Sequence, residues 1–152
     1  MNFYSKRFPM KPIFLMAFIS LFSYQCTTLK NTSALEGRQS QVIRKMIEAV
    51  NKKDADQYVA DFAETVQVYV DHSLKIDGRP ALKANRSQHF VNHPAVRSEI
   101  QYLIEIDNKV IMHDKVWLKD SDQKGQDIVE IFTFAEGKVV RVDVIQSQYL
   151  FQ

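Results

Sequence analysis

The second half of the chain constrains the fold most, because it consists almost wholly of strand patterns separated by short connections. Alternating or β-branched stretches occupy residues 98–106, 109–118, 127–134 and 138–148. Two-residue turns at 107–108 and 136–137 join some of them, and the polar segment 119–126 joins the others. Strands joined in this way pair antiparallel, and none of the connections resembles a parallel crossover. The pattern predicts an antiparallel meander and argues against a doubly wound parallel sheet.

Helical patterns precede the meander. Helices are predicted over residues 39–52, 55–62 and 80–92, with one strand over 66–71. The first helix has one apolar stripe, made of Val42, Met46, Ala49 and Val50. Asp54 is placed to cap the second helix, and Pro80 lies in the first turn of the third. Helices followed by an antiparallel meander predict an α+β fold whose sheet curves around them.

The N-terminus has the features of a secretion signal. Lys6, Arg7 and Lys11 precede an almost wholly apolar run over residues 12–24. A run of about 12 to 13 residues is too short to cross a bilayer, which takes ~20, but it matches the apolar region of a signal peptide. We therefore expect an exported protein with residues 1–26 as signal peptide, 27–38 as polar tether and 39–148 as one domain.

Cys26, the only cysteine, ends this apolar run and leaves two alternatives open. Lipidation of Cys26 would anchor the protein to the bacterial envelope, and this anchor would be its one contact with a membrane. Ordinary cleavage nearby would release it to the periplasm. Ser23 and Gln25 stand where a lipobox has an aliphatic and a small residue, so the motif does not decide between them.

Charge and histidine content exclude some classes of ligand. The formal net charge is only +2, and part of it lies in the N-terminal leader, so the chain lacks the basic surface of a nucleic-acid-binding protein. His89 and His93 have a spacing that can bind a metal, but zinc sites use three or four ligands. We expect no nucleic-acid partner, no metal and no cofactor.

Short motifs add a family resemblance. The sequences IVEIFTF (128–134), EGKVV (136–140) and DVIQ (143–146) resemble the closing hairpin of SnoaL-like proteins, in the nuclear transport factor 2 superfamily. Val142 stands where that hairpin commonly has Trp, and YVDHS (69–73) resembles the family's Tyr-x-x-His-Asn stretch. The resemblance covers residues 39–148. It implies a cystatin-like fold, in which a cone-shaped curved antiparallel sheet wraps around three N-terminal helices.

Glu130 is the first candidate catalytic residue. Alternation places it on one strand face with Ile128 and Phe132. Apolar surroundings disfavour a charged carboxylate, so its pKa would rise and it could donate a hydrogen bond or a proton. The resemblance to ketosteroid isomerases implies the same role, because Glu130 matches the acid that donates to the substrate oxyanion there. The alternatives are a solvent-exposed Glu or one paired with Arg or Lys.

Asp71 and His72 are candidate bases, because they lie where the first strand meets its turn. Resemblance to ketosteroid isomerases favours Asp71, and resemblance to the predicted aldol-condensation enzymes favours His72. Neighbours on a strand point in opposite directions, so at most one is expected to face a pocket; ordinary turn chemistry is the alternative. Met46 matches the place of a helix-one tyrosine of ketosteroid isomerases, so that hydroxyl donor is not expected.

The remaining candidates would contact ligand. They are Tyr69, His113, Phe132 and Val142. Altogether, the sequence predicts an exported pocket protein that binds a small, mostly apolar carbonyl compound or performs isomerisation, cyclisation or aldol chemistry on it. The alternative is a non-catalytic binding or interaction module that dimerises through the outer sheet face (Arg141, Asp143 and Trp117). A third hypothesis is an immunity or accessory domain of a secretion system.

Overall fold

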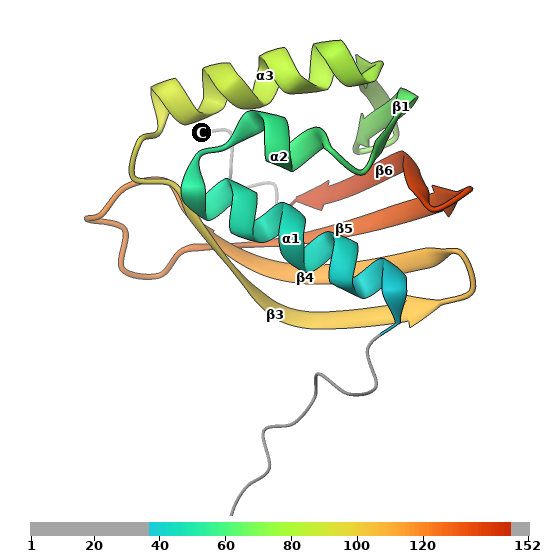
Figure 1. The fold of residues 1–152 in the computed structure, drawn as a ribbon. Helices are drawn as coiled ribbons and strands as arrows, with labels where there is room; N and C mark the ends of the chain where they lie inside the picture. Colours follow the sequence, from blue (N-terminus) through green and yellow to red (C-terminus); the bar gives the residue numbers. More distant parts are fainter. Residues whose placement is uncertain (1–36, 147–152) are drawn as a thin grey trace, which may run out of the picture. The chain divides into compact units, whose positions relative to one another are not determined.

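The computed structural model describes residues 37–146, which form three helices over the concave face of one curved sheet (Figure 1). The elements are α1 (Arg38–Lys52), α2 (Ala55–Val59), β1 (Phe62–Val70), β2 (Ser73–Asp77), α3 (Arg79–Asn92), β3 (Arg97–Ile106), β4 (Lys109–Trp117), β5 (Gln126–Ala135) and β6 (Lys138–Gln146). This arrangement confirms the predicted α+β fold. The expected signal peptide, Cys26 and most of the tether lie outside the described residues.

The sheet is mixed, with strand order β2-β1-β6-β5-β4-β3. The meander from β3 to β6 is antiparallel, as the short connections predict. β1 instead pairs in parallel with β6, with Val68 opposite Val142 and Val70 opposite Val144. This contact joins segments far apart in the sequence, so no local turn signal announces it. None of the helices in residues 37–146 has the length and apolar character needed to span a membrane.

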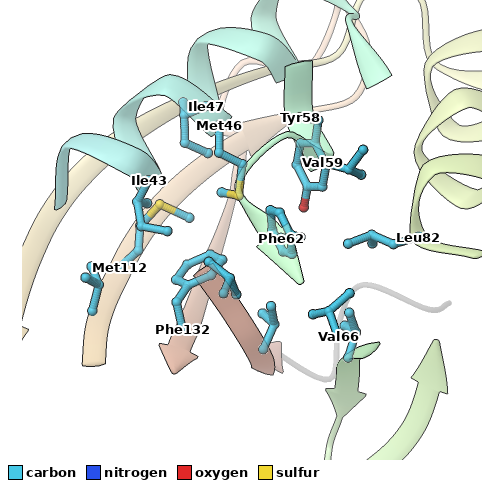
Figure 2. Close-up of a cluster of buried hydrophobic side chains, with 14 of the residues drawn as sticks. Ile43, Met46, Ile47, Tyr58, Val59, Phe62, Val66, Leu82, Met112 and Phe132 are labelled. Carbon is cyan, nitrogen blue, oxygen red and sulfur yellow. The ribbon is translucent and has the colours of Figure 1, made fainter. Parts of the chain in front are cut away.

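The core lies between the helices and the inner face of the sheet. Ile43 and Ile47 are buried on α1 beside the predicted Met46 and Ala49, so the apolar stripe is wider than expected. Figure 2 shows Ile43, Met46 and Ile47 in one cluster with Tyr58, Phe62 and Phe132. The Asp54 side chain accepts a hydrogen bond from the Gln57 backbone N–H at 2.9 Å, which confirms the predicted cap of α2.

Two predicted boundaries are wrong. α2 ends at Val59 rather than at Phe62, because Phe62 pairs with Val139 of β6 and so begins β1. β2 was not expected as a strand, because it is short and largely exposed; it forms a hairpin with β1. The link between β1 and β2 consists of Asp71 and His72, with φ of 48° and 67°. Positive φ at both central residues is characteristic of the tight hairpin turn that matches the twist of the strands.

A bulge in β3 changes the predicted face of that strand. The register between β3 and β4 shifts between Ile100 and Tyr102, so that Ile100 lies opposite Asp114 but Tyr102 lies opposite His113. Ile100 therefore packs against the core, whereas Tyr102 and Ile104 are 70% and 51% exposed on the outer face. The alternating pattern of residues 98–106 predicts that Ile100 shares one face with Tyr102, Ile104 and Ile106. This prediction is wrong at Ile100, because an inserted residue breaks the alternation.

Candidate functional site

Two cavities meet under α3. The smaller, about 60 Å³, is lined by Met46, Tyr58, Asp114, Glu130 and neighbouring apolar side chains. The larger, about 940 Å³, lies beside it and has walls from β1, β2, β5, β6 and α3. Arg86, His89 and Val116 line both cavities, which places these residues where the two spaces meet.

Strand alternation brings two carboxyl groups into the smaller cavity. Glu130 lies opposite Met112, and Asp114 lies opposite Ile128, so the two acids are diagonal neighbours on the inner face of β4 and β5. Diagonal neighbours on adjacent antiparallel strands are close enough for side chains to interact. Asp114 is only 3% exposed. The site therefore contains a pair of acids in apolar surroundings.

Burial and mutual repulsion change the proton affinity of both acids. Burial, followed by the nearby charge of Asp114, raises the pKa of Glu130 to about 8, although the positive charge of Arg86 opposes the change. Burial also raises the pKa of Asp114 to about 6, against a hydrogen bond from Ser98. Near neutral pH the pair accordingly shares about one proton. One group can donate a hydrogen bond while the other can accept a proton.

Ser98 and Asn51 hold Asp114 in place. The Ser98 hydroxyl donates to Asp114 Oδ2 at 2.5 Å, while Asp114 Oδ1 has no hydrogen-bond partner within residues 37–146. The backbone of Ser98 is bound at two points by the Asn51 side chain at the C-terminal end of α1. Asn51 Nδ2 donates to the Ser98 carbonyl at 2.9 Å, and the Ser98 N–H donates to Asn51 Oδ1 at 2.8 Å. One oxygen of Asp114 is thus fixed and the other stays available.

Tyr58 brings a phenol to the same cavity from α2. Figure 2 shows its ring beside Val59 and close to Phe62. The ring centroids of Tyr58 and Phe62 are 5.5 Å apart in a stacked arrangement. Burial raises the pKa of Tyr58 to about 12, so its hydroxyl keeps its proton at physiological pH. The sequence comparison implied no tyrosine donor at Met46. Met46 does line the cavity, but the hydroxyl comes from a different helix.

The larger cavity combines apolar walls with basic groups on α3. Val68, Val70 and Ile76 are part of its apolar lining. Arg86 and His89 face it from one stripe of α3, and His93 lies just after the end of that helix. The rings of His89 and His93 are 4.8 Å apart. Burial, with the charges of Arg86 and His93, lowers the pKa of His89 to about 4. Within residues 37–146 no group of three or more His, Cys, Asp or Glu is placed to hold a metal.

The predicted site residues fall in three different places. Glu130 lines the smaller cavity, as its alternation indicates. Asp71 lines the rim of the larger cavity, whereas its exposed neighbour His72 does not. Phe132 and Val142 are buried in the core and line neither cavity. The structure therefore does not bring Asp71 or His72 to Glu130 in the smaller cavity.

Tyr69 and His113 lie on the outer face of the sheet. Tyr69 donates a hydrogen bond to Gln67 Oε1 at 3.0 Å, and the Arg141 guanidinium lies 3.9 Å from its ring centroid. His113 Nε2 is 2.9 Å from Asp127 Oδ1, and its ring stacks on Tyr102 at 5.9 Å. Both predicted ligand contacts are on the face opposite the cavities.

Asp114, Tyr58 and Arg86 line the smaller cavity but were not among the predicted site residues. The signal for Asp114 was present, because alternation that puts His113 outside puts Asp114 inside with Val110 and Met112. Tyr58 gave no such signal, because a tyrosine beside Val59 on a short helix is typical of a core residue. Nothing in the local sequence of α3 indicates that Arg86 reaches a cavity, because that depends on how α3 crosses the sheet.

Comparisons with known proteins agree with this fold. The sequence profile of the SnoaL-like domain matches residues 43–142. A cystatin-fold protein from Novosphingobium aromaticivorans superposes with a TM-score of 0.65 at 20% identity, covering 73% of this chain and 100% of that one. A SnoaL-like protein of unknown function from Burkholderia thailandensis gives 0.64 at 18% identity, covering 72% and 94%.

A de novo designed protein with a curved β-sheet also superposes, with a TM-score of 0.64 at 12% identity over 75% of this chain and 88% of that one. A search of curated proteins gave no match. At these identities the structural likenesses establish the fold, and the chemistry has to be argued from the site.

Proposed function

This protein belongs to the SnoaL-like family, and on that premise we propose that its cone holds a small, mostly apolar carbonyl compound and performs acid–base chemistry on it. The observation that carries this proposal is the pair of acids in the smaller cavity, one with its pKa raised to about 8 and the other to about 6. Two acids with separated proton affinities can serve as donor and base at the same pH.

The proposed reaction uses this pair directly. Protonated Glu130 donates a hydrogen bond to the carbonyl oxygen, and ionised Asp114 removes a proton from the carbon beside the carbonyl. The electrons of that C–H bond form an enolate, whose oxygen Glu130 stabilises. Return of the proton from Asp114 to another carbon completes an isomerisation. Attack of the enolate carbon on a second carbonyl, whose oxygen then takes the proton, gives cyclisation or aldol addition.

Cavity sizes support a division of the ligand into head and body. The smaller cavity, about 60 Å³, has room for a carbonyl group but not for a whole substrate, whereas the larger one, about 940 Å³, is within the range of small-molecule pockets. The apolar body would then lie in the larger cavity, with Asp71 at its rim. We therefore assign the base to Asp114 and keep Asp71 as a rim contact.

Deuterium exchange tests this proposal. In D₂O the full chain should accelerate loss of the ¹H NMR signal of the protons beside the carbonyl of 2-octanone. Glu130→Gln should lose that acceleration, and Glu136→Gln, in the exposed β5–β6 turn, should keep it. A thermal shift by 2-octanone without exchange would mean binding without turnover. Neither shift nor exchange would contradict the proposal.

The outer face favours a second candidate function, a binding module that dimerises. Ile104 lies opposite Ile111, which lies opposite Ile131, so apolar side chains form a continuous row across three strands. Tyr102 and Ile145, 70% and 53% exposed, lie in the next row. Arg141 and Asp143 bind each other at 2.6 and 2.7 Å, which leaves the apolar rows as the surface for a second copy. Trp117 is covered by Arg97, 3.7 Å from its ring centroid.

Light scattering separates these alternatives. The proposed dimer should give twice the mass of the chain, and Ile104→Lys should reduce it to the mass of one chain. Lys45→Gln, at an exposed position of α1, is the control and should keep the dimer mass. A wild-type protein with the mass of a single chain at all concentrations would rule out the dimer.

Export and lipidation remain proposals from the sequence. We propose that residues 1–26 direct the protein out of the cytoplasm and that Cys26 is either lipidated or removed with the signal. Labelling of producing cells with a clickable fatty acid decides between these alternatives. Label on the wild type and none on Cys26→Ser would establish the anchor, whereas an unlabelled wild type would leave a periplasmic protein.

A further inference from the structure

Arg86 carries a positive charge at the junction of the two cavities. It is half-buried on α3 and lines both spaces. Its Nε and Nη2 donate hydrogen bonds to Asn85 Oδ1 at 3.2 and 2.9 Å, and its guanidinium lies 5.6 Å from the Tyr58 ring centroid. Within residues 37–146 no carboxylate forms an ion pair with it. A partly buried guanidinium without a counter-ion is unfavourable, because one neutral acceptor and one ring face replace only part of the solvation that burial removes.

Glu130, the acid whose pKa Arg86 affects, does not act as its counter-ion. Arg86 lowers the pKa of Glu130, yet burial and Asp114 still raise that pKa to about 8, so Glu130 is mostly neutral at pH 7. Asp114 binds Ser98 through one oxygen, and within residues 37–146 it forms no ion pair with Arg86. The positive charge therefore remains available to a molecule that enters the cavities.

The charged groups that line the larger cavity also favour an anionic ligand. Lys75 and Arg86 bring two positive charges to its lining and Asp71 brings one negative charge, which leaves a net charge of one positive. Ring nitrogens that can donate hydrogen bonds come from His89, on the same stripe of α3 as Arg86, and from His93, just after the end of that helix. The apolar walls, among them Val68, Val70 and Ile76, face these groups from the sheet.

We infer that the ligand is an apolar acid, whose carboxylate binds Arg86 at the junction while its hydrocarbon chain lies along the larger cavity. This inference rests on the proposed function, because it names the class of that same ligand: an oxo acid whose carbonyl reaches Glu130. A planar guanidinium is suited to a carboxylate, which it can bind through two parallel hydrogen bonds. The apolar walls then bury the chain, which provides most of the affinity.

Two probes of equal chain length test the inference on the full chain: octanoate and methyl octanoate. Titration followed by NMR chemical shifts should give a dissociation constant at least about tenfold lower for octanoate, since a charge-assisted pair is stronger than a neutral hydrogen bond. Arg86→Gln should remove that preference and Arg86→Lys should retain part of it. Lys45→Gln, which removes one positive charge from an exposed site on α1, should keep the wild-type preference.

Each outcome has a separate meaning. Equal affinity of the wild type for both probes would overturn the anion site and leave the proposed pocket function standing. If neither octanoate nor methyl octanoate binds, both the anion site and the proposed pocket function are overturned. A preference for octanoate that survives Arg86→Gln would place the anion elsewhere and overturn the assignment to Arg86. The comparison of the two probes on the wild type does not depend on how any variant folds.

Discussion

Two side-chain pairs lie on the same two strands but on opposite faces; the inner pair is two carboxyl groups and the outer pair is a histidine and an aspartate. Asp114 and Glu130 point inward, and burial raises both pKa values. His113 and Asp127 point outward, where the hydrogen bond from His113 lowers the pKa of Asp127. His113 and Asp114 are adjacent in the sequence. A shift of one residue along a strand thus separates a group suited to proton transfer from one that forms an ordinary surface ion pair.

The largest contrast between the faces should appear in stability. Phe132→Ala removes a side chain that is fully buried on the inner face and should lower the free energy of unfolding by about 3–5 kcal/mol. Ile131→Ala, one residue away on the half-buried outer face, should cost only about 1 kcal/mol. Urea denaturation measures both losses. Equal losses would mean that the outer face is buried too, for instance by a second copy.

A contrast of similar size should appear in catalysis. Asp114→Asn removes the proposed base and should slow the exchange of 2-octanone protons by about 10²–10⁴-fold. Asp127→Asn, which removes a carboxylate from the outer pair, should leave the rate unchanged. Exchange rates from ¹H NMR at pH 7 provide the comparison. If both substitutions slowed exchange alike, the inner pair would have no special role.

The pH dependence of stability should isolate Glu130. Because folding raises its pKa from 4.5 to about 8, the folded protein keeps a proton that the unfolded chain has released. The free energy of unfolding should therefore fall as pH rises from 6.5 to 8, by up to about 1.4 kcal/mol per pH unit. The lowered pKa of His89 has the opposite effect, but only below about pH 6.5. Glu130→Gln should flatten this dependence of the free energy of unfolding on pH, and Glu136→Gln should preserve it.

The smallest effect is expected from the outer pair. His113 and Asp127 are 33% and 58% exposed, so solvent screens their attraction. Asp127→Asn should leave the thermal unfolding midpoint at pH 7 unchanged within error. A clear drop would show that this pair is shielded from water, as it would be inside a dimer interface.

Local pattern was sufficient to predict much of the fold. The turns at 107–108 and 136–137 and the alternation between them define the hairpins, and Asp54 caps α2 as its side chain suggests. The parallel pairing of β1 with β6 and the bulge after Ile100 were not predictable in this way. The first depends on a contact across the whole domain, and the second on one residue that interrupts an otherwise regular period.

The site was predictable only where alternation decides it. Glu130 shares its face with Ile128 and Phe132, and the same rule places Asp114 inside as soon as His113 is placed outside. Asp71 and His72 were chosen because they resemble family motifs, but both lie in a tight turn. The placement of Arg86 at the cavities depends on how α3 lies over the sheet, and the sequence pattern of a helix does not predict that position.

The double hydrogen bond between Asn51 and Ser98 has a consequence for engineering this pocket. Asn51 is exposed at the end of α1 and touches no ligand space, yet through Ser98 it sets the position of the Asp114 carboxylate. Proton affinity and ligand shape can therefore be adjusted by separate sets of mutations. A library at position 51 would tune the base from outside the cavity, while the walls that select the hydrocarbon chain keep their form.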